Sequence, residues 1–143
     1  METKFNFKSQ ICTSREQSER LLALGLKKET ADMIYHSYGY IIDEFGNKER
    51  KFKLPTMRNT EDYEGKYDIP AWSLHRLCAM MPKNIAIDED TAYPLQIQKR
   101  SDGKWCVGYQ GWYDCVGDLY DSVIRIYQQL ISEGYLDEFC NKG

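Results

Sequence analysis

The sequence contains no long apolar run. Nowhere in its 143 residues does a stretch approach the roughly 18 apolar residues that a membrane-spanning helix requires. The opening segment METKFNFKSQICTS also has no continuous apolar core of the kind that defines a secretory signal. We therefore expect a cytoplasmic protein without a membrane segment.

Paired cysteines are also missing. The five cysteines are odd in number and widely spaced, and none forms a C-x-x-C motif. The sequence therefore indicates neither a disulfide framework nor a zinc ribbon. Buried or half-buried free thiols are the default expectation for such residues. The cysteines are Cys12, Cys78, Cys106, Cys115 and Cys140.

Motifs for catalysis and cofactor binding are scarce. The glycine-rich phosphate-binding patterns are absent, and the carboxylates at 88–90 lack the ligand spacing of a calcium loop. Of the two histidines, His36 follows Asp32 by one helical turn, as in an exposed charge pair. His75 and Cys78 are three residues apart, a spacing open to a nucleophile with its base or to half a zinc site. We expect no cofactor and no metal, and keep a small metal- or thiol-dependent enzyme around His75 and Cys78 as an alternative.

Dense positive charge is absent too. The net charge is −3, and although Lys and Arg outnumber Asp and Glu over residues 1–58, no segment reaches the charge density of a surface that tracks phosphates. The stretch SREQSERLLALGLKKETADMIYHSYG resembles a helix-turn-helix, but the outer face of its second helix carries Glu29 and Asp32 with only Lys28. Phosphates repel carboxylates, so the sequence predicts a packed helical hairpin and not a DNA reader.

The helical hairpin is predicted over residues 14–38. Ser14 caps its first helix and Gln17 completes a capping box. Gly25 closes that helix, because glycine tolerates the left-handed backbone of a helix end. The second helix is predicted from about residue 28 to residue 37, with its apolar side facing the core.

A change of period after Gly39 predicts a β-hairpin over residues 40–54, turning at residues 45–47. Its second strand combines basic residues with Phe52, a combination that suits single-stranded nucleic acid. Lysines also protect an edge strand from aggregation, and this is the interpretation that we favour. The basic residues are Lys48, Arg50, Lys51, Lys53 and Arg58.

Three more elements are predicted further along the chain. They are a helix over residues 70–81, a hairpin over residues 94–109 and a C-terminal helix over residues 118–133. Pro70 fits the first turn of the first of these helices, and the Asp-Gly pair at 102–103 fits the turn of the hairpin. The last helix has an apolar arc about 160° wide, with Asp118 as its cap and Asp121 and Arg125 as an i, i+4 ion pair.

These elements define the expected fold class. Their order is α-α-β-β-α-β-β-α, with hairpins instead of parallel crossovers. We expect a single α+β domain over residues 1–143, in which an antiparallel sheet from two hairpins carries about four helices on one face.

Three phrases of the sequence also resemble a known family. SREQSERLLALGLKKETADM, DIPAWSLHRLCAMMP and the terminal LISEGYL are similar to a recurrent family of short, uncharacterised bacterial proteins associated with prophages and other mobile elements. The resemblance implies a small cytoplasmic accessory protein. It brings no assigned activity and no functional residue, and the chain departs from the family's pattern between about residues 38 and 66.

Tyrosine is the one residue type in clear excess. Eleven Tyr in a chain of this length fit an aromatic-rich core, which is the commoner outcome, and also a partly exposed aromatic surface, because tyrosine suits interfaces. We expect a non-catalytic module that binds another macromolecule, with a protein as the favoured partner, and a homodimer is compatible with exposed strand edges. Single-stranded nucleic acid held by the basic residues of 48–58 is the alternative. The expected aromatic contacts are Tyr38, Tyr40, Tyr109, Trp112 and Tyr113.

Overall fold

Three α-helices and a set of small antiparallel sheets make up the fold, in a computed structural model that describes residues 9–141 apart from 60, 62, 87 and 111. The side chain of Trp112 also lies outside the description. The expected α+β class is confirmed. The expected four helices and the expected order are not, since the described residues form three α-helices, two 3₁₀ turns and ten short strands.

The elements follow one another along the chain in this way: α1 (Arg15–Ala23), η1 (Lys28–Thr30), β1 (Met33–Tyr35), β2 (Ser37–Ile42), β3 (Lys48–Phe52), β4 (Thr56–Met57), β5 (Ile69–Ala71), α2 (Leu74–Met80), β6 (Asn84–Ala86), β7 (Ala92–Pro94), β8 (Gln96–Lys99), β9 (Trp105–Tyr109), β10 (Trp112–Cys115), α3 (Leu119–Ser132) and η2 (Asp137–Phe139).

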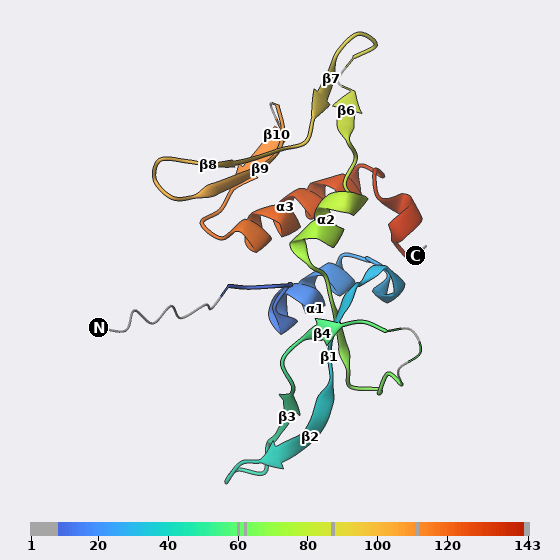
Figure 1. Cartoon of the computed structure of the whole chain (residues 1–143), viewed down its shortest axis with the longest axis vertical. Coiled ribbons are helices and arrows are strands. Elements are labelled where there is room, and N and C mark those ends of the chain that lie inside the picture. The colour runs from blue at the N-terminus through green and yellow to red at the C-terminus, as the bar shows by residue number, and fades with distance from the viewer. Residues whose placement is uncertain (1–8, 60, 62, 87, 111, 142–143) are drawn as a thin grey trace, which may run out of the picture.

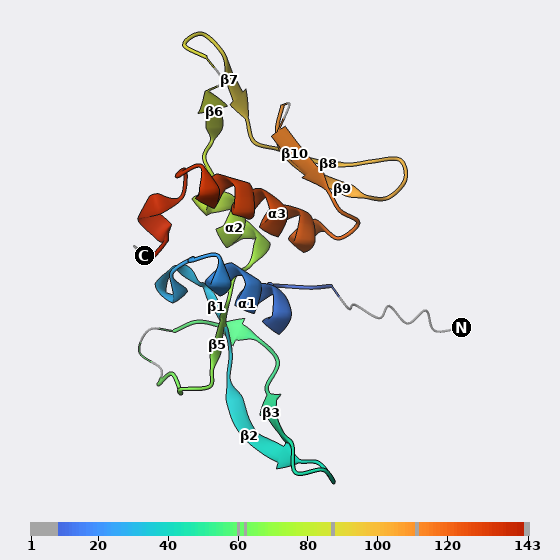
Figure 2. The ribbon, with the colours of Figure 1, turned by 180° about the vertical axis from the view of Figure 1, so that it is seen from behind.

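The strands form four separate antiparallel sheets within the described residues, with orders β4-β1-β5, β10-β9-β8, β2-β3 and β6-β7. One shared sheet with helices on one face was expected, and this part of the prediction is wrong. The helices instead occupy the middle of the molecule (Figure 1). The β2–β3 pair extends from one end, and the β6–β7 and β8–β9–β10 sheets lie at the other, as the reverse view also shows (Figure 2).

The C-terminal helix α3 is the centre of the core. It matches the predicted range closely, and the Asp118 carboxylate caps it by accepting from the backbone N–H of Asp121 at 3.0 Å. Its apolar arc contacts β9 and β10 on one side and α1 on the other. Each large side chain buried in this way contributes about 1.5–3 kcal/mol to folding. The buried residues of α3 are Tyr120, Ser122, Val123, Ile124, Ile126, Tyr127 and Leu130.

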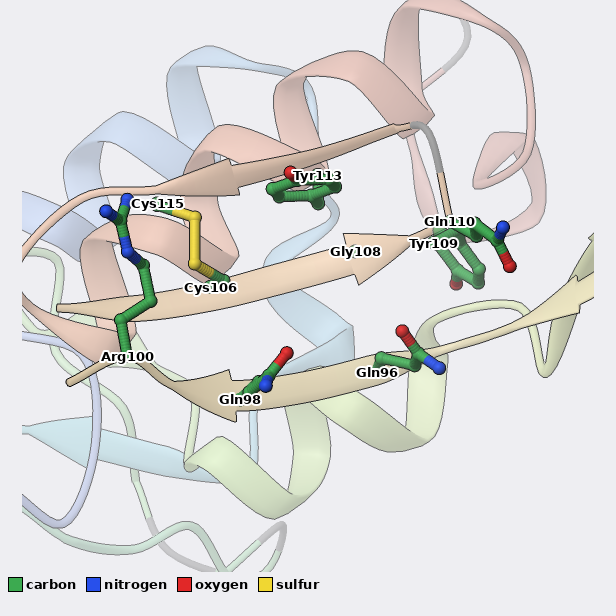
Figure 3. A pocket seen from close by; sticks show the side chains of 9 residues that line it. All are labelled: Gln96, Gln98, Arg100, Cys106, Gly108, Tyr109, Gln110, Tyr113 and Cys115. Carbon is green, nitrogen blue, oxygen red and sulfur yellow. A yellow bond between two sulfur atoms is a disulfide. The ribbon is translucent and has the colours of Figure 1, made fainter.

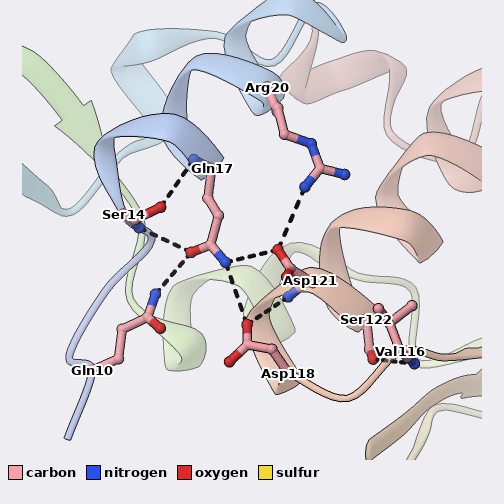
Figure 4. A network of polar contacts seen from close by, with 8 residues as sticks. All are labelled: Gln10, Ser14, Gln17, Arg20, Val116, Asp118, Asp121 and Ser122. Carbon is pink, nitrogen blue, oxygen red and sulfur yellow. Dashed lines mark hydrogen bonds and ion pairs between the residues drawn. The ribbon is translucent and has the colours of Figure 1, made fainter.

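Polar contacts join α1 to the first turn of α3 (Figure 4). The Asp121 carboxylate accepts from the Gln17 amide at 2.8 Å and from the Arg20 guanidinium at 3.4 Å. The i, i+4 pair of Asp121 with Arg125 was expected, but Arg125 instead lies 3.5 Å from Asp114 of β10. Both charged residues of the expected pair thus connect α3 to other elements.

The predicted second helix of the hairpin is wrong. Residues 28–30 form a single 3₁₀ turn, and β1 and β2 follow. Short polar side chains compete with the helical backbone here: the Thr30 hydroxyl donates to the Lys27 carbonyl, and the Asp32 carboxylate accepts from the backbone N–H of Ser73. Met33 and Ile34 are adjacent and both buried, a pattern that fits a strand covered on both faces as well as a helix.

The predicted helix over residues 70–81 begins later than expected. Ser73 caps α2, and residues 69–71 form β5, which pairs with β1. Pro70 therefore lies in a strand and not in a first helical turn. This is tolerated because β5 is an edge strand of its sheet.

Both predicted hairpins are present with altered limits. β2 begins at Ser37 instead of residue 40 and pairs with β3. β8 and β9 pair around Gly103, whose φ of 87° matches an Asp-Gly turn. The acidic residues 88–90 are exposed, between β6 and β7.

A disulfide joins two of the five cysteines, which the sequence did not indicate. Cys106 of β9 lies opposite Cys115 of β10 in the strand register, and the two are bonded. The sequence predicted the strand β9 but not β10, so it did not place Cys106 and Cys115 opposite each other. Cys12 and Cys140 are buried thiols and Cys78 is a half-buried thiol, as expected.

Among the described residues, no helix combines the length and the apolar character that crossing a bilayer would require.

The indole of Trp72 joins the two halves of the core. The side chain is fully buried, its Nε1 donates to the Thr30 hydroxyl at 2.9 Å, and its backbone N–H and C=O both contact Thr13. Trp72 lies between β5 and α2, so it fixes where the chain passes from the β1 sheet to the helices.

We expect Trp72→Ala to lower the free energy of unfolding by about 3–5 kcal/mol, because it leaves a large cavity. Trp72→Phe keeps most of the packing and loses one hydrogen bond, so its cost is about 1–2 kcal/mol. Urea denaturation measures both values. Tyr113→Ala, at an exposed site, is the control and stays within about 0.5 kcal/mol of the wild type. A cost under about 1 kcal/mol for Trp72→Ala would contradict this role.

Candidate binding surface on the β2–β3 arm

The exposed apolar side chains gather on the β2–β3 arm, which we define as residues 37–54. The arm extends away from the helices in both views (Figures 1 and 2). A protruding two-stranded ribbon with this much exposed apolar surface is a typical interaction site. Its exposed large side chains are Tyr38, Tyr40, Ile41, Ile42, Phe45 and Leu54.

The tip of the arm is an ordered turn. The Asp43 carboxylate accepts from the backbone N–H groups of Phe45 and Asn47, each at 2.9 Å. These hydrogen bonds, with that from Asn47 first, lower the pKa of Asp43 below its usual value. Gly46 has a φ of 82°, which only glycine adopts easily. The turn thus holds β2 and β3 in a fixed register.

The base of the arm is fixed by Asp68. Its carboxylate, which is nearly buried, lies 2.8 Å from Nδ1 of His36 and accepts from the backbone N–H groups of Ser37 and Gly65. Burial alone would raise the pKa of Asp68, but the two amides and the imidazole outweigh burial and hold that pKa below its usual value. His36 therefore pairs with Asp68, and not with Asp32 as expected.

Aromatic rings and cations alternate on one face of the arm. Arg50 lies opposite Tyr40 in the strand register, and its guanidinium is 5.3 Å from the Tyr40 ring centroid. Lys48 approaches the same ring at 5.0 Å. On its other side Arg50 lies 3.3 Å from the ring centroid of Tyr67, which Asp68 anchors next to the arm. The order Lys48, Tyr40, Arg50, Tyr67 defines a ladder that we call the aromatic–cation ladder.

A shallow positive hollow of about 320 Å³ lies beside β3. Arg15 of α1 covers the Phe52 ring at 4.5 Å and lines this hollow together with Lys51 and Lys53. Glu49 also lines it and lies 3.8 Å from Lys51, but such an exposed pair is worth little. Cations thus outnumber carboxylates on this part of the surface.

Four of the five predicted basic residues belong to the arm, and Arg58 does not. Its guanidinium is bound to the Glu64 carboxylate at 2.6 Å and donates to the Lys28 and Ala31 carbonyls. Arg58 thus holds the loop after β4 against η1. The positive charge of Arg58 is therefore paired with Glu64 within the protein.

The predicted aromatic residues do not form one surface. Tyr38 and Tyr40 are 61% and 48% exposed on the arm, and Tyr113 is exposed on β10 at the far end of the molecule. Tyr109 is only 1% exposed, and its hydroxyl donates to the Pro82 carbonyl. The side chain of Trp112 lies outside the described residues.

The alternative chemical site on α2 gains no support from the geometry. His75 is exposed and Cys78 is half-buried, and burial raises the pKa of the Cys78 thiol, opposite to what a nucleophile needs. Within the part of the chain that the structure describes, no three His, Cys, Asp or Glu residues are placed to share a metal ion.

Three residues of the site were missed in the sequence: Arg15, Tyr67 and Asp68. Each reaches the arm from a distant segment, which no local pattern shows. The spacing of Gly65 and Asp68 was the one available signal, because Asp commonly accepts from the backbone of a nearby turn.

Comparison with protein-family models, with curated proteins and with solved structures gives no match.

The Asp68 anchor predicts a pH effect. Because its pKa is depressed in the folded state below the ordinary 3.8, the stabilisation is complete above about pH 4–5 and is lost as pH falls through the folded-state pKa. Asp68→Asn lowers stability at neutral pH and flattens this acid limb. Denaturation between pH 2 and 7 measures the difference.

Asp90→Asn, in the exposed turn after β6, is the matched control and keeps the wild-type pH profile. An unchanged acid limb in Asp68→Asn would show that the carboxylate does not hold the base of the arm.

Proposed function

We propose that this chain is a non-catalytic binding module and that its arm holds a single-stranded nucleic acid. The observation behind the proposal is the aromatic–cation ladder: the ring of Tyr40 on the protruding ribbon and the ring of Tyr67 beside it alternate with Lys48 and Arg50. Exposed rings offer stacking surfaces for bases, and cations between them match the phosphates of the same strand.

The exposure of the rings supports this occupant. Tyr40 and Tyr67 are each about half exposed, although two cations contact each ring: Lys48 and Arg50 for Tyr40, and Arg50 and Lys66 for Tyr67. Stacking needs unpaired bases, because the bases of a duplex already stack on one another. A single strand therefore fits better than a duplex.

The charge on the arm supports the same choice. Lys48, Arg50 and Lys53 make no ion pair within the described residues, and Lys51 has only its long contact with Glu49. Unpaired cations at a protein interface would need matching carboxylates on the partner, whereas any nucleic acid supplies phosphates. These unpaired cations therefore support a nucleic acid over the protein partner that the sequence favoured.

Carboxylates set a limit on affinity. Asp43, Glu44 and Glu49 lie on the arm, and the net charge of the chain is −3. We therefore expect a Kd on the order of 10 μM at physiological salt, in the range of sequence-independent binding, and tighter binding at low salt.

The test is fluorescence anisotropy with a labelled oligo-dT strand of about 12 nucleotides. With four cations in contact, log K falls against log salt with a slope of about −3. Tyr40→Ala weakens binding at least about fivefold through lost stacking, and Lys48→Ala with Lys51→Ala reduces the salt slope by about 1.4.

Matched controls lie at the other end of the molecule. Tyr113→Ala removes an equally exposed ring, and Lys83→Ala with Lys104→Ala removes two exposed cations outside the arm; both bind as the wild type does. Absence of binding at 50 mM salt refutes the proposal. So does a stoichiometric protein partner that is lost with Tyr40→Ala while no oligonucleotide binds, and this outcome would assign the arm to a protein.

A further inference from the structure

A second surface lies at the opposite end of the molecule, on the β8–β9–β10 sheet. One face of this sheet packs on α3, where Val107 is fully buried. The other face forms an open pocket of about 490 Å³. Strand register explains its shape, because Gln96, Gly108 and Tyr113 form one cross-strand row and Gly108 leaves the floor of that row without a side chain.

The Cys106–Cys115 disulfide lies in the neighbouring row of the same face, beside Gln98. Both cysteines line the pocket and are partly exposed, and the disulfide lies on the pocket face of the sheet (Figure 3). The other three cysteines are thiols. One open disulfide among free thiols is unlike the framework of a disulfide-stabilised domain and is typical of a redox couple.

The fold does not depend on this bond. β9 is held by backbone pairing to β8 on one side and to β10 on the other, and it packs on α3. Breaking the disulfide therefore leaves the sheet paired. A bond that opens without unfolding the protein can cycle reversibly between its oxidised and reduced forms.

The polar groups of the pocket suit a small acidic peptide. The amides of Gln96 and Gln98 present donors and acceptors along β8. Arg100 follows them on the same side of the sheet as the disulfide (Figure 3). Its Nη2 lies 3.2 Å from the Asp102 carboxylate, an exposed contact that leaves further N–H groups to bind a carboxylate.

We propose that this pocket is a thiol–disulfide exchange site for a low-molecular-weight thiol that carries a carboxylate. The incoming thiolate attacks one cysteine sulfur and forms a mixed disulfide, while the Cys106–Cys115 bond breaks and its electron pair remains on the other cysteine as a thiolate. A second thiolate attacks the mixed disulfide and leaves as a symmetrical disulfide. Two small thiols are oxidised, the protein gains two electrons, and protons released by the thiols are taken up by the cysteines.

Arg100 is the positioning residue of this site, since it orients the carboxylate of the thiol and does not itself react. Because Arg100 is positively charged, its removal changes the reduction rate differently for acidic, neutral and cationic thiols. The loss of a purely structural residue would change all three rates alike. Glutathione is the acidic probe, 2-mercaptoethanol the neutral probe and cysteamine the cationic probe. Alkylation of the released thiols followed by peptide mass spectrometry measures the rate at Cys106 and Cys115.

We expect Arg100→Ala to slow reduction by glutathione about two- to fivefold, as for the loss of one exposed ion pair. The rate with 2-mercaptoethanol stays unchanged and the rate with cysteamine rises. Lys104→Ala removes an exposed cation outside the pocket and changes the three rates less. In Cys115→Ser, oxidised glutathione forms a mixed disulfide with Cys106, and Cys106→Ser gives the same adduct at Cys115.

Two results overturn the proposal. One is a disulfide that resists millimolar glutathione while circular dichroism shows a folded protein. The other is an Arg100→Ala variant in which all three thiols are slowed equally or none is affected. Neither outcome bears on nucleic-acid binding by the arm, which Arg100→Ala leaves unchanged.

Discussion

The buried polar junction around Trp72 holds the molecule together. Its indole N–H donates to Thr30, while its backbone exchanges hydrogen bonds with Thr13, whose hydroxyl in turn contacts Ser18 of α1. Trp72 is thus bonded directly to Thr30 and Thr13, and through Thr13 to α1, and its indole N–H has a partner. Because an unsatisfied buried donor is costly, this junction admits few alternative packings. The path of the chain from the helices to the β1 sheet follows from it.

The two ends of the molecule are therefore held in place by different sets of contacts. The arm is fixed at its base by Asp68 and at its tip by Asp43, whose carboxylates bind residues of the arm or next to it, and Arg15 of α1 contacts Phe52 of the arm. The opposite sheet is fixed by α3, through buried apolar residues and the contact of Arg125 with Asp114. A central core with two separately anchored surfaces allows each surface to have its own chemistry.

Local patterns predicted the elements whose causes are local. The capping box of Ser14 and Gln17, the cap at Asp118 and the wide apolar arc of α3 all involve residues within one element, and the structure contains them. The second helix failed because Thr30 and Asp32 are bonded to residues 72 and 73, about forty positions away. The basic residues of β3 could be predicted from the composition of that segment. The aromatic–cation ladder could not be predicted, because Tyr67 comes from a distant segment and is placed next to Arg50 by the neighbouring Asp68.

The bulge between Ser37 and Gly39 in β2 has a consequence for self-association. Within the described residues the ribbon has no third strand, so both of its outer edges have main-chain groups open to further pairing. A bulge increases local twist and interrupts the regular ladder that another ribbon would need to continue. Charged residues also lie along β3, and in a stacked copy like charges would lie next to each other and repel. These residues are Lys48, Glu49 and Lys51. These features oppose edge-to-edge pairing of the uncovered ribbon with a second copy.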